Sequence, residues 1–224
     1  MAILIVNPNA NPAVTSAIDA TAEAFRPASP DAIEVIDLPD APFGIESQRD
    51  ADLVAPMLSR LAAERQDLDG LIVACFSDPG VPGCREAAPY PVWGIGEASV
   101  MTALARVESA GVIALSESAI ARHYRIWRRL GIASRIAGEV AVDLHVADSV
   151  DGAALPRLEA AGQTLIARGA EALILGCAGM GHHAAALEAR LGRPVIDPVA
   201  AATGLAVASA LTASRGLAPI RTVL

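Results

Sequence analysis

Two cysteines, Cys75 and Cys177, are the residues of this chain whose placement suggests shared chemistry. Each follows a short apolar run and precedes small, turn-forming residues, in GLIVACFSDP at 70–79 and EALILGCAGM at 171–180. An apolar run of this length beside glycine is typical of a buried parallel strand, so each thiol is predicted at the carboxyl end of a strand. Open α/β sheets bind ligands at that end. The pattern therefore favours two opposed thiols in one cleft.

Two thiols on opposite sides of one carbon atom can invert a stereocentre. A thiolate removes an acidic C–H proton from one face, the second thiol returns a proton to the other face, and each turnover exchanges the two roles. The carbanion would be an enolate, whose oxygen needs hydrogen-bond donors. The candidate donors are the backbone amides in the turns after the two cysteines, at Phe76, Ser77 and Asp78 and at Ala178, Gly179 and Met180.

A cysteine at the end of an apolar run is also an ordinary small core residue. Equivalent placement of two such residues in two similar halves favours a functional interpretation. Cys84 lies beyond the sequence PGVPG and has no counterpart in the second half, so it is interpreted as structural.

The elements expected around the cysteines repeat once along the chain. Pro91 follows Cys75, and Pro194 follows Cys177, at nearly the same separation, which indicates that one βα unit is used twice. We therefore expect an α/β fold of two similar lobes related by a pseudo-two-fold axis, each a small parallel sheet flanked by helices. Strands are predicted at 2–6, 32–37, the Cys75 run and 91–95, and again at 111–115, 135–142, the Cys177 run and 194–197.

The boundary between the lobes is expected to be discontinuous, because the apolar helix after Asp197 is predicted to return to the first lobe. The first lobe would then contain residues 1–97 plus about 205–224, the second would contain 98–204, and the active site would lie in the cleft between them. Ser47 is predicted to cap a helix, and a loop is expected after Cys75 at Pro79, Gly80, Pro82 and Gly83.

Composition excludes several classes of function. Hydrophobic residues make up 53% of the 224 residues and charged residues 19%, as expected for parallel strands covered on both faces. Aromatic residues make up 3% and the formal net charge is -8, so neither base stacking nor binding of a phosphate backbone is favoured and nucleic acid is not an expected partner. No cluster has the spacing of a metal site and no glycine-rich phosphate loop is present, so no cofactor is expected.

The sequence also predicts a cytoplasmic protein with free thiols. Three cysteines do not make a disulfide framework, and the amino-terminal apolar run lacks the basic segment of a signal peptide. The apolar stretch at 198–213 is too short and too interrupted to span a membrane, so a buried helix is expected there. His123 and His145 are given no special role.

Four motifs occur in the order found in one known family: NPN at 7–9, ACFSDPG at 74–80, PVWGIGEA at 91–98 and LGCAGM at 175–180. With them the chain resembles the aspartate/glutamate/hydantoin racemase superfamily, and most of all its hydantoin and allantoin racemase branch. The resemblance implies cofactor-independent racemisation of a small molecule by Cys75 and Cys177. A homo-oligomer is expected as well.

The resemblance also suggests ligand contacts. Asn9 is expected to contact the ligand, and Asn7 to support it or to make a second contact, although Asn-Pro-Asn is also ordinary turn chemistry. Ser116 ends the equivalent strand of the second half, where substrate binding and helix capping both remain open. Ser77 and Asp78 are expected at the site, Asp78 with the alternative of ordering the turn. Glu117 is expected close to the cleft.

Departures from the glutamate racemase branch favour a neutral substrate. That branch has Thr-His directly after its second cysteine, whereas this chain has Ala178 and Gly179. The missing groups would assist removal of the poorly acidic proton of a free amino acid. A ring carbon between an amide nitrogen and a carbonyl is more acidic, so we predict a racemase of 5-substituted hydantoin or allantoin. An amino-acid racemase, a related decarboxylase or isomerase, and a non-catalytic two-lobed binding protein remain alternatives.

Overall fold

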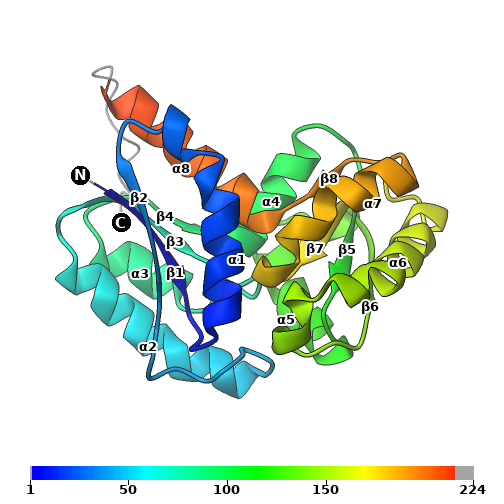
Figure 1. Cartoon of the computed structure of the whole chain (residues 1–224), viewed down its shortest axis with the longest axis horizontal. Helices are drawn as coiled ribbons and strands as arrows, with labels where there is room; N and C mark the ends of the chain where they lie inside the picture. The colour runs from blue at the N-terminus through cyan, green and yellow to red at the C-terminus, as the bar shows by residue number, and fades with distance from the viewer. Residues whose placement is uncertain (1, 215–224) are drawn as a thin grey trace.

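Two four-stranded parallel sheets form the framework of the computed structural model, which describes residues 2–214 (Figure 1). The strand orders are β2-β1-β3-β4 and β6-β5-β7-β8, so the second sheet repeats the topology of the first. This confirms the predicted α/β fold of two similar lobes and makes β3 the equivalent of β7. The strands are β1 (Ala2–Asn7), β2 (Ala32–Asp37), β3 (Leu68–Val73), β4 (Val92–Gly94), β5 (Ala110–Ala114), β6 (Ile136–Ala141), β7 (Ala172–Gly176) and β8 (Val195–Ile196).

Helices connect the strands and cover both faces of each sheet (Figure 1). The α-helices are α1 (Pro12–Glu23), α2 (Gln48–Glu64), α3 (Val81–Ala87), α4 (Ile95–Leu104), α5 (Glu117–Arg129), α6 (Leu155–Ala167), α7 (Ala184–Leu191) and α8 (Pro198–Ser214). Short 3₁₀ helices are η1 (Arg26–Ala28), η2 (Ala133–Arg135), η3 (Val146–Val150), η4 (Gly152–Ala154) and η5 (Ala178–His183).

Burial on both faces explains the uninterrupted apolar strands. In β1, Ile3 and Ile5 pack into the same hydrophobic cluster as α1 and α8, whereas Leu4 and Val6 pack into the cluster formed with α2 and α3. Successive strand residues point to opposite faces, so both sets must be apolar. The same packing brings the carboxyl ends of β1 and β3 to one edge, where the chain continues into Cys75.

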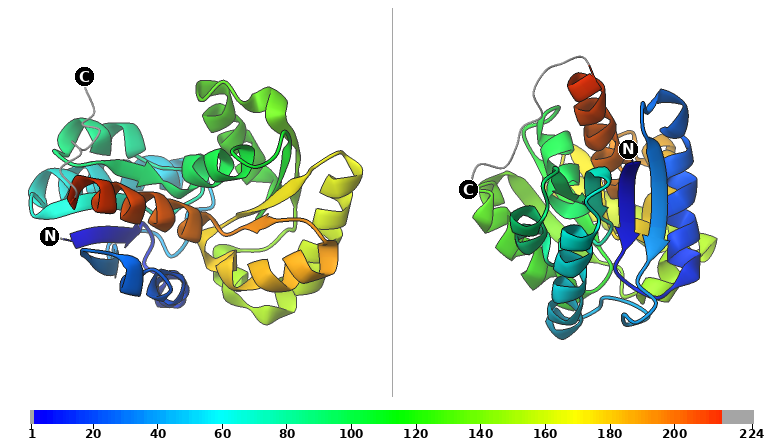
Figure 2. Two further views of the ribbon diagram at one scale, coloured as in Figure 1. Left: turned by 90° about the horizontal axis from the view of Figure 1, so that it is seen from above. Right: turned by 90° about the vertical axis from the view of Figure 1, so that its left-hand side faces the viewer.

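Helix α8 leaves the second sheet after β8 and lies along the first lobe (Figure 2). It packs against α4, α1 and β3. Residues 215–224 of the proposed first-lobe segment lie outside the described residues, and the boundary at 97/98 remains a prediction. Within residues 2–214, no helix combines the length and the apolarity that a membrane crossing requires.

The predicted loop after Cys75 is wrong in its second half, because α3 begins at Val81. Pro82 lies in the first helical turn, where its missing N–H costs no helical hydrogen bond. Gly80 precedes the helix with φ of 69°, a conformation that glycine adopts without strain. The proline and glycine residues thus mark a helix start, and Cys84 is buried within α3.

Candidate active site

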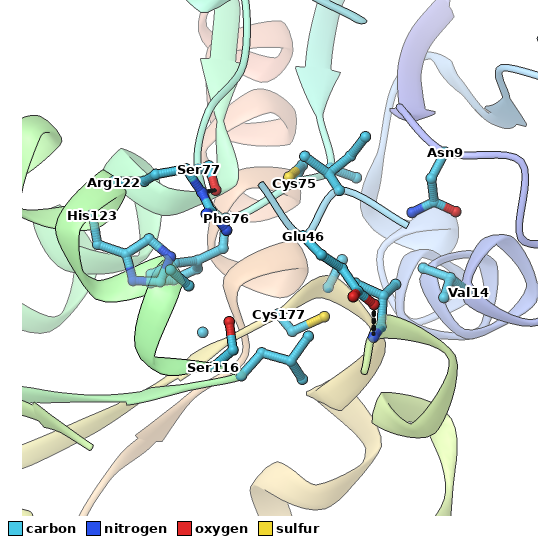
Figure 3. Close-up of a pocket in the computed structure, with 17 residues that line it drawn as sticks. Asn9, Val14, Glu46, Cys75, Phe76, Ser77, Ser116, Arg122, His123 and Cys177 are labelled. Atoms are coloured by element: carbon cyan, nitrogen blue, oxygen red, sulfur yellow. Dashed lines mark hydrogen bonds between the residues drawn. The ribbon is translucent and has the colours of Figure 1, made fainter. Parts of the chain in front are cut away.

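Cys75 and Cys177 lie at equivalent positions of the two lobes and line one cavity (Figure 3). Cys75 follows β3 and is partly buried, and Cys177 follows β7 with 9% of its surface exposed. Both thiols therefore reach the same space from different lobes. The duplicated topology produces this arrangement, because each cysteine ends the third strand of its lobe.

The turns after the two cysteines are also equivalent. The Asp78 amide donates to the Cys75 carbonyl at 2.9 Å, and the Met180 amide donates to the Cys177 carbonyl at 3.2 Å. A further backbone amide in each turn acts on the cysteine, because the Ser77 N–H lowers the pKa of Cys75 and the Gly179 N–H lowers that of Cys177. Most of the amides that the sequence suggested as oxyanion donors therefore close the turns or support the thiolates.

Burial controls the acidity of both thiols. It raises the pKa of Cys75 to about 12, against the opposing effects of the Ser77 amide and the Arg122 cation. Burial likewise raises the pKa of Cys177, which the Gly179 amide and the Ser149 hydroxyl lower in part. The negative charge of an ionised Cys177 further raises the pKa of Cys75, so the two sulfurs favour a state with at most one thiolate.

Ser149 is a neighbour of Cys177 that sequence reasoning missed. It is fully buried in η3, donates to the Val146 carbonyl at 2.7 Å, and its hydroxyl lowers the pKa of the Cys177 thiol. It lies so close to Gly179 that a Cβ atom there would meet the Ser149 Oγ at 2.2 Å. Glycine at position 179 thus permits the contact between η3 and the cysteine turn, although Gly179 itself does not line the cavity.

The Asn-Pro-Asn turn presents one amide to the cavity. Asn9 lines it, and its Oδ1 accepts from the Asn7 side chain at 3.0 Å and from the Asn11 backbone at 2.9 Å. Because the oxygen is held from behind, the NH₂ group of Asn9 faces the cavity (Figure 3). Asn7 is fully buried beneath the turn and donates to Thr15 as well, so it supports Asn9 and lies outside the cavity.

The structure brings together seven of the twelve residues that the sequence suggested for the site. Five others lie elsewhere for different reasons. Glu117 is exposed in the first turn of α5, Met180 is fully buried in the core, and Asn7, Asp78 and Gly179 support residues that face the cavity. The seven that line it are Asn9, Cys75, Phe76, Ser77, Ser116, Cys177 and Ala178.

Asp78 caps helix α4. Its two carboxylate oxygens accept from the backbone amides of Gly96 and Glu97, each at 2.8 Å. Burial and the negative charge of Glu97 raise the pKa of Asp78 to about 8, against the effect of those amides. Gly96 allows the approach, because a Cβ atom there would lie 2.2 Å from the Phe76 carbonyl oxygen. Asp78 therefore ties the Cys75 turn to α4.

Replacing Asp78 with alanine is expected to lower the free energy of unfolding by about 1 to 2 kcal/mol, because two buried helix amides lose their acceptor. Urea denaturation at neutral pH measures this change. Asp40→Ala is the matched control, since Asp40 is exposed and a surface substitution of this kind changes stability by less than about 0.5 kcal/mol. An unchanged denaturation midpoint for Asp78→Ala would refute the capping role.

Three further cavity residues, Glu46, Arg122 and His123, were not anticipated. Glu46 lies in the loop before α2, where the predicted cap Ser47 forms a reciprocal capping box with Asp50. Its carboxylate accepts from the Val146 amide at 2.9 Å (Figure 3). The same carboxylate contacts His145 Nδ1 at 3.1 Å. A loop of the first lobe is thereby fixed to the second lobe beside the thiols.

Arg122 and His123 come from the buried face of α5, together with Ala119, Ile126 and Trp127. These residues recur at the spacing of an apolar helical face, so a charged residue among them was a sequence signal for the site. His123 Nδ1 contacts the buried carboxylate of Glu139 at 2.7 Å, and its ring packs edge-on against Phe76 with centroids 4.8 Å apart.

The cavity suits a small ligand. The space open to the centre of a water molecule is about 40 Å³, a few times what one buried water needs. Among the residues described, no three histidine, cysteine, aspartate or glutamate side chains form a group that could hold a metal ion. The rest of the lining is apolar and comprises Phe76, Ala178, Val14, Ile45, Ala74, Leu115, Ala119, Val146 and Gly176.

Comparison with known proteins agrees with this fold. Residues 3–206 match the family described as Asp/Glu/Hydantoin racemase. The hydantoin racemase of Paenarthrobacter aurescens is 32% identical over 212 residues, which cover 92% of this chain and 89% of the relative. The hydantoin racemase of Pseudomonas sp. (strain NS671) is 31% identical, with coverage of 90% and 82%.

Solved structures give the same assignment. The allantoin racemase from Klebsiella pneumoniae superposes with a TM-score of 0.87 at 29% identity, covering 98% of this chain and 90% of that one. The chain therefore belongs to the Asp/Glu/hydantoin racemase family. Within it, the chain is an isomerase of the hydantoin and allantoin racemase branch.

Proposed function

We propose that this enzyme racemises a five-membered cyclic ureide, a 5-substituted hydantoin or allantoin, by proton transfer through Cys75 and Cys177. The observation that carries the proposal is the equivalent placement of the two thiols, each supported by the amide two residues further along, on one small cavity. The activities named for the relatives support the choice of substrate class.

The reaction needs one thiolate and one thiol. The thiolate takes the proton from the stereogenic ring carbon, the C–H electron pair passes into the neighbouring carbonyl to form an enolate, and the opposite thiol then protonates that carbon from its other face. The product is the mirror-image ring, and the two cysteines have exchanged protonation states. The Asn9 NH₂ group is a side-chain donor for the developing enolate oxygen.

Proton NMR in deuterated water tests the proposal. With single-enantiomer allantoin, 5-isobutylhydantoin and 5-benzylhydantoin, the enzyme is expected to replace the proton on the stereogenic carbon with deuterium while optical rotation decays at a matching rate. The Cys75→Ser/Cys177→Ser double variant is the negative control, because it differs from the wild-type enzyme only in lacking both thiols. Rates are corrected for the uncatalysed exchange of each ring.

Two outcomes would contradict this function. Retention of proton and rotation by every ring, with exchange of aspartate or glutamate under the same conditions, would assign the enzyme to amino acids. Saturable binding of a ring without any exchange would indicate a binding protein. Homo-oligomerisation and a cytoplasmic location are further expectations, the first tested by light scattering coupled to size-exclusion chromatography.

A further inference from the structure

Arg122 is a buried cation in the cavity wall, and the proposed mechanism gives it no contact with the substrate. It is 7% exposed, lies on the inward face of α5, and lines the same space as the two thiols. Burial lowers the pKa of its guanidinium, yet an arginine side chain stays protonated in proteins. The cavity therefore carries a fixed positive charge beside Cys75.

The guanidinium has only neutral hydrogen-bond partners. Nε donates to Ser77 Oγ at 3.4 Å, and Nη1 donates to the Ser118 carbonyl at 3.1 Å. Within residues 2–214, no carboxylate lies within the 4.0 Å of an ion pair with Arg122, whereas Arg85 pairs with Glu97. The carboxylates of Asp50 and Glu46 act on Arg122 from beyond that distance and make no hydrogen bond with it. A buried guanidinium whose N–H groups meet no charged acceptor is suited to an acceptor on a ligand.

The imidazole of His123 and the carboxylate of Glu46 are already engaged. His123 Nδ1 is engaged by Glu139, and the carboxylate of Glu46 is bound to Val146 and His145. The Ser77 and Ser116 hydroxyls lie with Arg122 on the same side of the cavity (Figure 3). This side thus combines one cation with two hydroxyl groups.

The position of Arg122 relative to the thiols indicates which part of the substrate it meets. Figure 3 shows Arg122 and Asn9 on opposite sides of the two cysteines. If the cysteines flank the stereogenic carbon and Asn9 binds the carbonyl of the ring, the ring nitrogen and the substituent occupy the two other bonds of that carbon. Of these two groups, only the substituent extends out of the ring, and we place it toward Arg122. The apolar residues of the wall offer no such contact.

We propose that Arg122 selects hydantoins whose 5-substituent carries a hydrogen-bond acceptor, such as a ureido, carboxamide or carboxylate group, over hydantoins with an alkyl substituent of the same size. This inference rests on the proposed function and names the substrate class of that site. The guanidinium presents several N–H groups in a plane, which suits a carbonyl or carboxylate oxygen.

The test compares 5-(2-carbamoylethyl)hydantoin with 5-isobutylhydantoin, two rings whose substituents have similar size and differ in the acceptor. Wild-type enzyme is expected to have a higher kcat/KM for the carboxamide ring than for the isobutyl ring. Allantoin and 5-(2-carboxyethyl)hydantoin are expected to behave like the carboxamide ring. Arg122→Met is expected to lower kcat/KM for the carboxamide ring by roughly 10- to 100-fold, mainly through KM, because a charge-assisted hydrogen bond is lost. For the isobutyl ring a smaller loss is expected, through kcat and not through KM, because the Arg122 cation also lowers the pKa of the Cys75 thiol.

Two further variants keep the result interpretable. Arg128→Met removes an exposed arginine from the same helix and is expected to leave kcat/KM unchanged for both substrates. Arg122→Gln retains donors for the Ser118 carbonyl without the charge, and it is used if Arg122→Met does not fold. Circular dichroism of each variant reports the fold independently of activity.

Each other outcome overturns the inference. An equal loss of kcat/KM on both rings would assign Arg122 to the thiols or the enolate. If kcat/KM changed for neither ring, Arg122 would have no role in specificity. A wild-type preference for the isobutyl ring would contradict the inference directly while leaving the racemase intact. If wild-type enzyme exchanged no hydantoin at all, the proposed function itself would fail.

Discussion

Replacing either Cys75 or Cys177 with serine is expected to lower the rate of racemisation by roughly a thousandfold or more, because a serine hydroxyl is far too weak an acid to replace a thiol in proton transfer. In the proposed mechanism the two sulfurs supply the proton acceptor on one face and the proton donor on the other. Neither can be lost without stopping inversion. The decay of optical rotation with single-enantiomer substrate measures this rate in both directions.

Exchange of the ring proton separates the two-base reaction from simpler explanations. A variant with one remaining thiol still has a base on one face, and that base can return deuterium to the face from which it took the proton. Each single variant is therefore expected to exchange one enantiomer without inverting it, and the two variants are expected to differ in which enantiomer they exchange. A one-base enzyme would show no such reciprocal pattern.

Cys84→Ser is the matched control for these variants. Cys84 is buried in α3 within the hydrophobic cluster of the first lobe and does not line the cavity. Its substitution is expected to leave racemisation within about twofold of the wild-type rate, as for a packing residue outside the site. Full racemisation by Cys75→Ser or Cys177→Ser would reject the mechanism, and a similar loss in Cys84→Ser would indicate damage to the fold.

The fold was predictable because its determinants are local and occur twice. The apolar runs before Cys75 and Cys177 predicted the strands. The similar spacing from these cysteines to Pro91 and Pro194 predicted the repeat. Helix α3 was missed because the glycine and proline residues near Pro82 are as typical of a loop as of the first turn of a helix. Secondary structure at such a position depends on tertiary packing as well as on residue type.

The site was predictable only where its residues end strands. The two thiols and Asn9 do so, and the topology places them on one cavity. Glu46 and Arg122 reach the cavity from a loop and a helix face, so their contribution depends on how the lobes meet. For α5 a signal existed in the charged residue on an apolar stripe, whereas nothing in the sequence near Ser149 indicated its contact with Cys177.

The pH dependence of kcat/KM is expected to reflect the burial of the thiols. Burial raises the pKa of Cys75 to about 12 and also raises that of Cys177, so the thiolate is the minor form at neutral pH. Because the thiolate is the base, kcat/KM is expected to rise by about tenfold per pH unit from about pH 6.5 to about pH 9. No plateau is expected near about pH 8.5, where an exposed cysteine ionises.

Initial rates of proton exchange across this range measure the profile, after subtraction of the uncatalysed exchange, which also rises as hydroxide increases. Circular dichroism at each pH shows whether the protein stays folded. A plateau below about pH 8 would mean that the Ser77 and Gly179 amides, with Arg122, outweigh burial and hold one cysteine as the thiolate in the free enzyme. The position of the plateau thus decides whether burial or hydrogen bonding to sulfur sets the reactivity of this pair.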